Sequence, residues 1–94
     1  MNRYDIAVLQ GRSQSNFAIS AAAAQSPVMS GGVYDVWSDV DCWLKVGPDA
    51  TTGLTSATGY ALFANNVVSI DVRDGDRIGA IAGGAGALRF HQVG

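Results

Sequence analysis

The sequence contains little of the chemistry that enzymes use. It has one histidine, one cysteine and no glutamate, so all eight acidic residues are aspartates. A serine or cysteine nucleophile would have to use His91, and nothing in the sequence places such a residue beside it. One histidine and one cysteine cannot make a four-ligand zinc site. The sequence therefore predicts a protein that is not an enzyme and that has no cofactor.

Cys42 is the only cysteine, which excludes an intramolecular disulfide. The alternation around it indicates the inward side of a strand, where cysteine acts as a small buried hydrophobe. The N-terminus has no charged segment followed by an apolar run, so no secretory signal is expected. No window approaches the roughly 18 to 20 apolar residues that span a bilayer. We expect synthesis in a reducing cytoplasm and no membrane partner.

Charge is also scarce. Charged residues make up 15% of the 94 residues and leave a net charge of −2, whereas about 25% is usual in a domain. The positive residues are scattered, so the basic patch of a nucleic-acid-binding protein is missing. A single domain of this size has a small core, and without disulfides such domains often gain stability by oligomerisation. A surface poor in charge suits contact with another protein.

Alternation of apolar and polar residues dominates the chain, and Gly or Asp-Gly turn signals recur about every 8 to 12 residues. This pattern predicts an all-β antiparallel sandwich or barrel. The alanine run at 21–24 follows the alternating Phe17 and Ile19 and ends at Pro27, so we interpret it as the end of a strand. The eight expected strands are 3–10, 15–24, 32–37, 40–46, 58–64, 67–73, 77–82 and 87–93.

The segment 31–47, GGVYDVWSDVDCWLKVG, contains both tryptophans and the cysteine. A two-residue turn at Ser38-Asp39 would mix carboxylates into its apolar side, whereas a three-residue turn separates the two faces. One face of the resulting hairpin holds Tyr34, Val36, Cys42, Leu44 and Val46. The other face holds Asp35, Trp37, Asp41, Trp43 and Lys45. The outer face of this hairpin is therefore expected to carry two indoles among charges.

For residues 67–82 we can likewise ask which turn at Asp74-Gly75 keeps the apolar residues on one face. A two-residue turn would set Val72 against Arg77, so either a longer turn or a crossing to the other sheet is expected. Either one aligns Val68, Ile70 and Val72 with Ile78, Ala80 and Ala82. The glycines at 83–86 then form a turn into a last strand with Leu88 and Phe90 on one face and Arg89 and His91 on the other. The polar connection 47–57 has no periodicity, so we expect a mobile surface loop.

The pairs Asp39/Asp41 and Asp74/Asp76 suit turn chemistry better than cation binding, since neither has EF-hand spacing. His91 is expected to be solvated or in an interface. Tryptophan is enriched at the centres of interfaces, and an exposed pair on one sheet face needs covering. The interface predicted from these observations consists of Trp37, Trp43, Tyr60, Asp41 and Lys45. The alternative is that the tryptophans pack beneath a second layer of the protein itself.

Three stretches, YDVWSDVDCWLKVG, ATTGLTSATG and VVSIDVRDGDRIGAIAGGAGALRF, together resemble small virion proteins of tailed bacteriophages that are encoded among head-assembly genes. The resemblance covers roughly residues 17–93. The sequence differs from such proteins at Trp37 and Trp43, where they often carry polar residues. Residues 1–14 match nothing in the family and are expected to be an N-terminal arm or the first strand.

The resemblance implies a capsid decoration or cement protein, folded as a β-sandwich of jelly-roll type. It further implies that the protein binds the major capsid protein on the outer surface of the head, as a homo-oligomer and most simply a trimer. Its place would then be the virion, after synthesis in the bacterial host's cytoplasm. Two alternatives remain: another virion component in the neck, tail or receptor-binding appendage, or a carbohydrate-binding module that uses Trp37, Trp43 and Tyr60.

Overall fold

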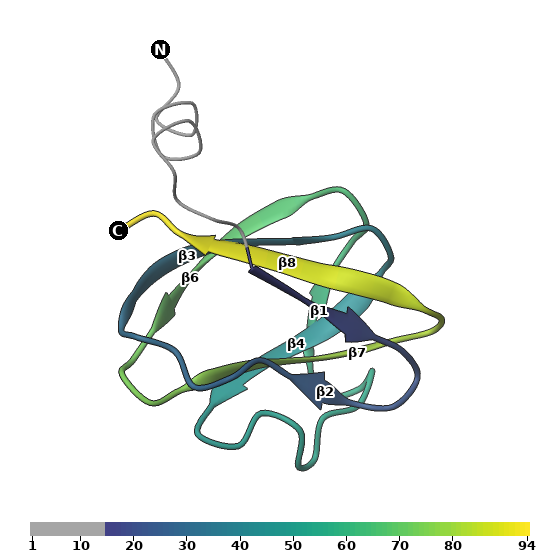
Figure 1. The fold of residues 1–94 in the computed structure, drawn as a ribbon. Helices are drawn as coiled ribbons and strands as arrows, with labels where there is room; N and C mark the ends of the chain where they lie inside the picture. The colour runs from purple at the N-terminus through teal and green to yellow at the C-terminus, as the bar shows by residue number, and fades with distance from the viewer. Residues whose placement is uncertain (1–14) are drawn as a thin grey trace.

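The computed structural model describes residues 15–94, and over that range it contains eight strands and no helix (Figure 1). The strands are β1 (Ser15–Ile19), β2 (Ala24–Gln25), β3 (Gly32–Ser38), β4 (Cys42–Gly47), β5 (Tyr60–Leu62), β6 (Val67–Val72), β7 (Arg77–Ala82) and β8 (Gly86–Gln92). The all-β prediction is therefore confirmed. The expected strand 3–10 and the possible arm at 1–14 lie outside the described residues.

The strands form two antiparallel sheets of four. Sheet A has the order β1-β8-β3-β6, and sheet B has the order β2-β7-β4-β5. Successive strands alternate between the two sheets at every connection except β4–β5, which joins neighbours in sheet B. Strands that are far apart in the sequence therefore lie side by side, as β1 and β8 do (Figure 1).

One apolar core lies between the sheets. Its members are the inward-facing residues of both layers, because side chains of a strand alternate between the two faces. Val36 and Leu88 from sheet A and Ile78 from sheet B are completely buried. Phe90 packs edge-on against both Phe17 and Tyr34, with ring centroids 6.2 Å apart in each pair. The layers thus form a sandwich-like arrangement around a single core.

The expected single strand at 15–24 is wrong, because the chain changes sheets there. β1 ends in sheet A at Ile19, which is buried in the core, and β2 begins in sheet B at Ala24. The Ser20 hydroxyl accepts a hydrogen bond from the Ala22 N–H at 3.3 Å, and the Ser20 carbonyl accepts one from the Ala82 N–H at 2.8 Å. One local and one long-range hydrogen bond therefore hold Ser20 where the alanine run crosses between the sheets.

The expected hairpin between β3 and β4 is also wrong. The two strands belong to different sheets, and the short connection at 39–41 carries the chain from one layer to the other. The Ser38 hydroxyl donates to the Val40 carbonyl and accepts from the Val40 N–H, which fixes the bend. The separation of inward and outward residues is nevertheless right. Tyr34, Val36, Cys42 and Leu44 are buried, and Val46 packs against the core.

The connection between β6 and β7 takes the second form that the sequence allowed, a crossing from sheet A to sheet B. Val72 and Ile78 are buried in the core on either side of it. Gly75 supplies the left-handed conformation that this turn needs, at φ 89°. The Asp74 carboxylate accepts a hydrogen bond from the Gly31 N–H, which joins this turn to the chain entering β3.

Candidate interaction surfaces

The outer face of sheet A carries Trp37. In the register of the sheet, Trp37 lies between Arg89 of β8 and Val67 of β6. Its indole meets the imidazole of His91 edge-on, with ring centroids 5.4 Å apart. Trp37 is half-buried, so part of the ring stays accessible on this face.

Asp35 and His91 are paired across β3 and β8 on the same outer face. Their outward direction is as expected, but their exposure is not, since Asp35 is 1% exposed and His91 is 7% exposed. The Ser69 hydroxyl donates to Oδ1 of Asp35 at 2.6 Å. The carboxylate therefore lies between the hydroxyl and the imidazole, whereas activation of a serine requires the imidazole beside the hydroxyl. Ser69, Asp35 and His91 therefore do not have the geometry of a nucleophile and its base.

The outer face of sheet B carries Trp43 and Lys45. Cys42 and Leu44 point into the core, so the residues between and beyond them point outward. The connection between β4 and β5 folds back over this face, and the Lys45 ammonium donates to the Thr52 carbonyl at 2.7 Å. Trp43 is half-buried, and its Cβ lies so close to Gly59 that a side chain there would collide with it.

The same connection, expected to be a mobile surface loop, packs on sheet B through two buried residues. Ala50 is completely buried, and its N–H donates to the side-chain carbonyl of Gln25 at 2.9 Å. Leu54 is 5% exposed. A Cβ atom at Gly79 would lie 1.9 Å from the Ala50 carbonyl oxygen, so only glycine lets the loop approach β7 so closely. The loop and sheet B therefore form a unit.

Asp49 organises the beginning of this loop. Its carboxylate accepts hydrogen bonds from the hydroxyls of Thr51 and Thr52, at 3.1 Å and 2.6 Å, and from their backbone N–H groups. The Thr52 hydroxyl has the largest effect in lowering the pKa of Asp49, and the other three bonds add to it. The loop geometry thus favours the charged carboxylate.

Three exposed apolar side chains lie on the edge strands β5 and β6 and the turn that joins them. Tyr60 is 62% exposed, Phe63 is 63% exposed and Val67 is 58% exposed. They belong to β5, to the turn that follows it and to the start of β6, and we call this group the β5–β6 edge. Asp41 fixes the turn, because its carboxylate accepts a hydrogen bond from the Ala64 N–H at 2.8 Å. Large apolar residues exposed along one edge are typical of contact sites.

The five predicted interface residues do not share one surface. Trp37 lies on the outer face of sheet A, and Trp43 and Lys45 lie on the outer face of sheet B. Tyr60 and Asp41 are near the β5–β6 edge. The change of sheet between β3 and β4 separates the two indoles, which the expected hairpin would have placed together. No single flat partner can cover both rings.

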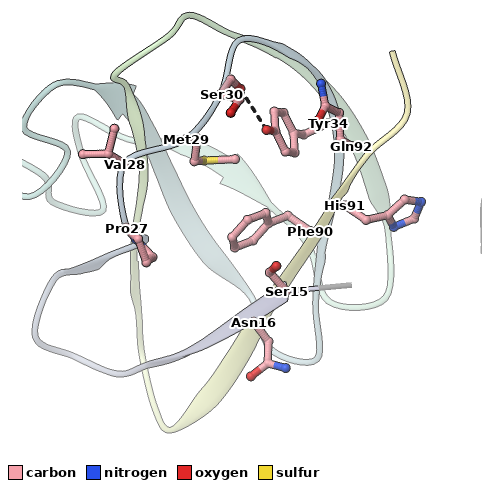
Figure 2. A pocket seen from close by; sticks show the side chains of 10 residues that line it. All are labelled: Ser15, Asn16, Pro27, Val28, Met29, Ser30, Tyr34, Phe90, His91 and Gln92. Atoms are coloured by element: carbon pink, nitrogen blue, oxygen red, sulfur yellow. Dashed lines mark hydrogen bonds between the residues drawn. The ribbon is translucent and has the colours of Figure 1, made fainter. Parts of the chain in front are cut away.

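A pocket of about 410 Å³ opens at the opposite edge of the sandwich. Its lining residues are Ser15, Asn16, Pro27, Val28, Met29, Ser30, Tyr34, Phe90, His91 and Gln92. Figure 2 shows Met29, Tyr34 and Phe90 pointing into it, while the imidazole of His91 points away. The Tyr34 hydroxyl donates to the Ser30 carbonyl at 2.8 Å, so the phenol group is satisfied and its ring lines the wall. We call this the β1–β2 pocket.

The remaining candidates have structural partners. Asp39 accepts a hydrogen bond from the Ala87 N–H at 2.9 Å and, like Asp41 and Asp74, fastens a turn to a segment that is distant in the sequence. Cys42 is a free, buried thiol whose pKa is raised, chiefly by burial. Among residues 15–94 no group of three His, Cys, Asp or Glu side chains could hold a metal ion. In that same range no helix could span a membrane.

Phe63 and the β1–β2 pocket were not found from the sequence. Phe63 could have been found, because Leu62 faces inward and the next residue of a strand must face outward. A large apolar residue in an outward position before the Asn65-Asn66 turn is the available signal. The pocket has no such signal, since it depends on how the 26–31 segment lies against Phe90 and Tyr34.

Comparison with known proteins gives no relative for this chain. No protein-family model, no curated protein and no solved structure matches it.

Proposed function

We propose that this chain is a non-enzymatic structural protein of a tailed-phage virion, a decoration or cement protein that binds the major capsid protein on the outer surface of the head. It acts there as a homo-oligomer, with a trimer as the expected form, and stabilises the shell. Oligomerisation multiplies weak contacts through effective concentration, so one small protein can hold neighbouring capsomers together.

The observation that carries the proposal is the β5–β6 edge. Three large apolar side chains, Tyr60, Phe63 and Val67, are each more than half exposed within eight residues of sequence. Burial of such side chains contributes about 1.5 to 3 kcal/mol each for residues of the Val and Phe type. A chain with 15% charged residues and such an edge is suited to permanent contact with other proteins.

The strand order supports the finer part of the proposal, that the fold is a jelly roll. Eight strands in the orders β1-β8-β3-β6 and β2-β7-β4-β5, with nearly every connection crossing between sheets, suit two nested Greek keys. Jelly rolls recur in viral capsid proteins and in lectins. Fold alone does not decide function, so the proposal also uses the resemblance of the strand and turn sequences to phage head proteins.

The test uses virions of the phage that encodes the chain and an antibody against the purified protein. Immunogold label over the head supports the proposal, and label confined to the neck or tail supports a different virion component. Heads that lack the protein should recover resistance to heat when the purified chain is added. Absence from virions, or no binding to such heads, would overturn the proposal.

A glycan array provides the test of the carbohydrate-binding alternative. The two tryptophans lie on opposite faces and Tyr60 lies at an edge, so the three rings make no common platform for a sugar. Specific glycan binding that is lost in Trp43→Ala, by a wild-type chain that does not bind heads, would favour that module over the capsid proposal.

A further inference from the structure

We propose that the capsid partner binds this chain by adding an extended segment to the free edge of β6, so that sheet A gains a strand. The inference rests on the proposed function and specifies how its contact is made. The added segment carries an apolar residue opposite Val67 and a basic residue opposite Asp71. It lies along the β5–β6 edge, so the exposed apolar side chains there belong to the same contact.

β6 is the longest edge strand of the described sandwich. It has six residues, whereas β1 has five, β5 has three and β2 has two. It pairs with β3 through consecutive residues without a bulge, and its sequence, VVSIDV, contains neither lysine nor proline. Bulges, lysine and proline are the usual features that prevent pairing at an edge. A long edge without them is a template for a further strand.

Hydrogen bonds at the start of β3 show which way its backbone groups point. The Val33 N–H donates to the Gly94 carbonyl at 3.2 Å, and the Val33 carbonyl accepts from the Val93 N–H at 2.8 Å. Both bonds lie on the β8 side, since residues 93 and 94 continue β8. Backbone groups of successive residues in an antiparallel strand point to opposite neighbours. The even-numbered residues of β3 therefore bond toward β6, as the Ser38 carbonyl does with the Asn65 N–H at 2.8 Å.

The odd-numbered residues of β6 present their backbone groups to the free edge. In the register, the even-numbered residues of β3 pair with the even-numbered residues of β6, from Val68 to Val72. The N–H and C=O groups of Val67, Ser69 and Asp71 therefore point away from β3. Within residues 15–94 no other strand pairs with this edge. All three residues are exposed, so an added strand meets one donor and one acceptor at each of them.

The side chains along this edge indicate the kind of segment that fits. Val67 is 58% exposed at the first position of β6, and Asp71 is exposed near the other end. Neighbours across two strands stabilise a sheet when both are apolar or when their charges are opposite. A segment with an apolar residue at one end and a lysine or arginine at the other satisfies both positions.

A second copy of β6 matches this edge poorly. Antiparallel pairing centred on Ser69 would place each Asp71 opposite Val67 of the other copy, with no cation beside the carboxylate. Parallel pairing in register would bring the two Asp71 side chains together, which is destabilising. The edge therefore fits a different protein better than a second copy, and the proposed partner on the head is a different protein.

The first test removes one outward backbone donor. Ser69→Pro deletes the N–H at the centre of the free edge, and proline is tolerated at such positions of edge strands. Ser69→Ala controls for loss of the hydroxyl, which donates to Asp35 at 2.6 Å. Ala18→Pro is the matched control on the other edge of sheet A. The register places Ala18 opposite Ala87, whose backbone groups point toward β3, so the Ala18 N–H points away from β8.

Co-sedimentation with heads measures each affinity, and circular dichroism with urea unfolding checks that each variant folds. We expect Ser69→Pro to bind at least about tenfold more weakly, because a carbonyl of the partner loses its donor and meets the proline ring. Ser69→Ala and Ala18→Pro should stay within about twofold of the wild type. A folded Ser69→Pro variant that binds like the wild type overturns this inference and leaves the proposed function standing. A wild type that does not bind heads overturns both.

Hydrogen exchange of the wild type gives a second test that needs no substitution. The amides of Val67, Ser69 and Asp71 should exchange freely in the isolated protein and at least about tenfold more slowly on heads. Unchanged exchange on heads would contradict an added strand. Slow exchange already in the isolated protein would place a second copy, or the chain's own residues 1–14, on the edge and would likewise overturn the inference.

Asp71 tests the chemistry of the added segment. Asp71→Asn should weaken binding to heads by about two- to fivefold, because an opposite-charge pair across two strands makes a modest contribution. Asp71→Lys should weaken it further, and both effects should shrink at high salt. If Asp71→Lys bound heads as well as the wild type, no basic residue would lie opposite Asp71, and the proposed chemistry of the segment would be wrong.

Discussion

At the scale of single residues, Cys42 shows how burial controls reactivity. Its side chain is 1% exposed and its pKa is raised by desolvation, so very little thiolate forms at neutral pH. We expect a disulfide reagent to modify native Cys42 at least about a hundredfold more slowly than the denatured chain, because reaction requires local opening. The exposed Gly84→Cys thiol serves as the control and should react at once. Equal rates at the two sites would contradict burial of Cys42.

Asp49 gives the chain a predictable response to acid. Hydrogen bonds lower its pKa in the folded state, so its stabilising contribution is complete above the unfolded value of about 3.9. This contribution to the free energy of unfolding is lost as the pH falls from the unfolded pKa through the lower pKa of the folded state. Wild type and Asp49→Asn should therefore differ most in urea midpoint near neutral pH, and the difference should shrink below about pH 4.

A second variant separates this effect from general acid unfolding. Thr52→Val removes the hydroxyl that contributes most to the lowered pKa, so the carboxyl resonance of Asp49 should titrate at higher pH in that variant. The same titration curve in wild type and Thr52→Val would show that the hydroxyl does not hold the carboxylate.

At the scale of elements, the 48–59 loop depends on the absence of a side chain at Gly79. Gly79→Ala would drive a methyl group into the backbone of Ala50 and lift the loop from sheet B. We expect a loss of about 1 to 3 kcal/mol in the free energy of unfolding, together with faster hydrogen exchange of the Ala50 amide. Gly84→Ala is the control, since nothing lies within 4 Å of a Cβ there and its cost should be close to zero.

The strands themselves could largely be predicted from alternation, but the connections could not. Val36 and Cys42 face the core whether the turn between them closes a hairpin or crosses to the other sheet, so parity gives the same answer for both. The bend between β3 and β4 depends on the Ser38 hydroxyl and on a hydrogen bond that Asp39 accepts from the distant Ala87 N–H. The local sequence does not specify that long-range bond. The buried state of Asp35 was missed for a related reason, since it depends on which strands flank β3.

At the scale of the whole molecule, the two outer faces are unequal. The chain's own 48–59 loop packs on the outer face of sheet B at Trp43, Lys45 and Gly79. On sheet A, Trp37 and Val67 leave apolar surface open near the β5–β6 edge. The sequence predicted aromatic side chains for contact but could not divide them between faces, because their division follows from the change of sheet after β3. A head that binds this protein should therefore meet sheet A and its β6 edge first.

Substitution of the two tryptophans tests which sheet contacts the head. We expect Trp37→Ala to weaken binding to heads by about tenfold or more, because loss of an interface tryptophan commonly costs 2 kcal/mol or more. Trp43→Ala should leave that affinity nearly unchanged and should instead lower the free energy of unfolding by about 1 to 3 kcal/mol, because Trp43 lies half-buried against the loop. Co-sedimentation with heads gives the first quantity and urea denaturation gives the second. If Trp43→Ala abolished binding in a protein of unchanged stability, sheet B would be the contact face, and the loop would have to open to expose it.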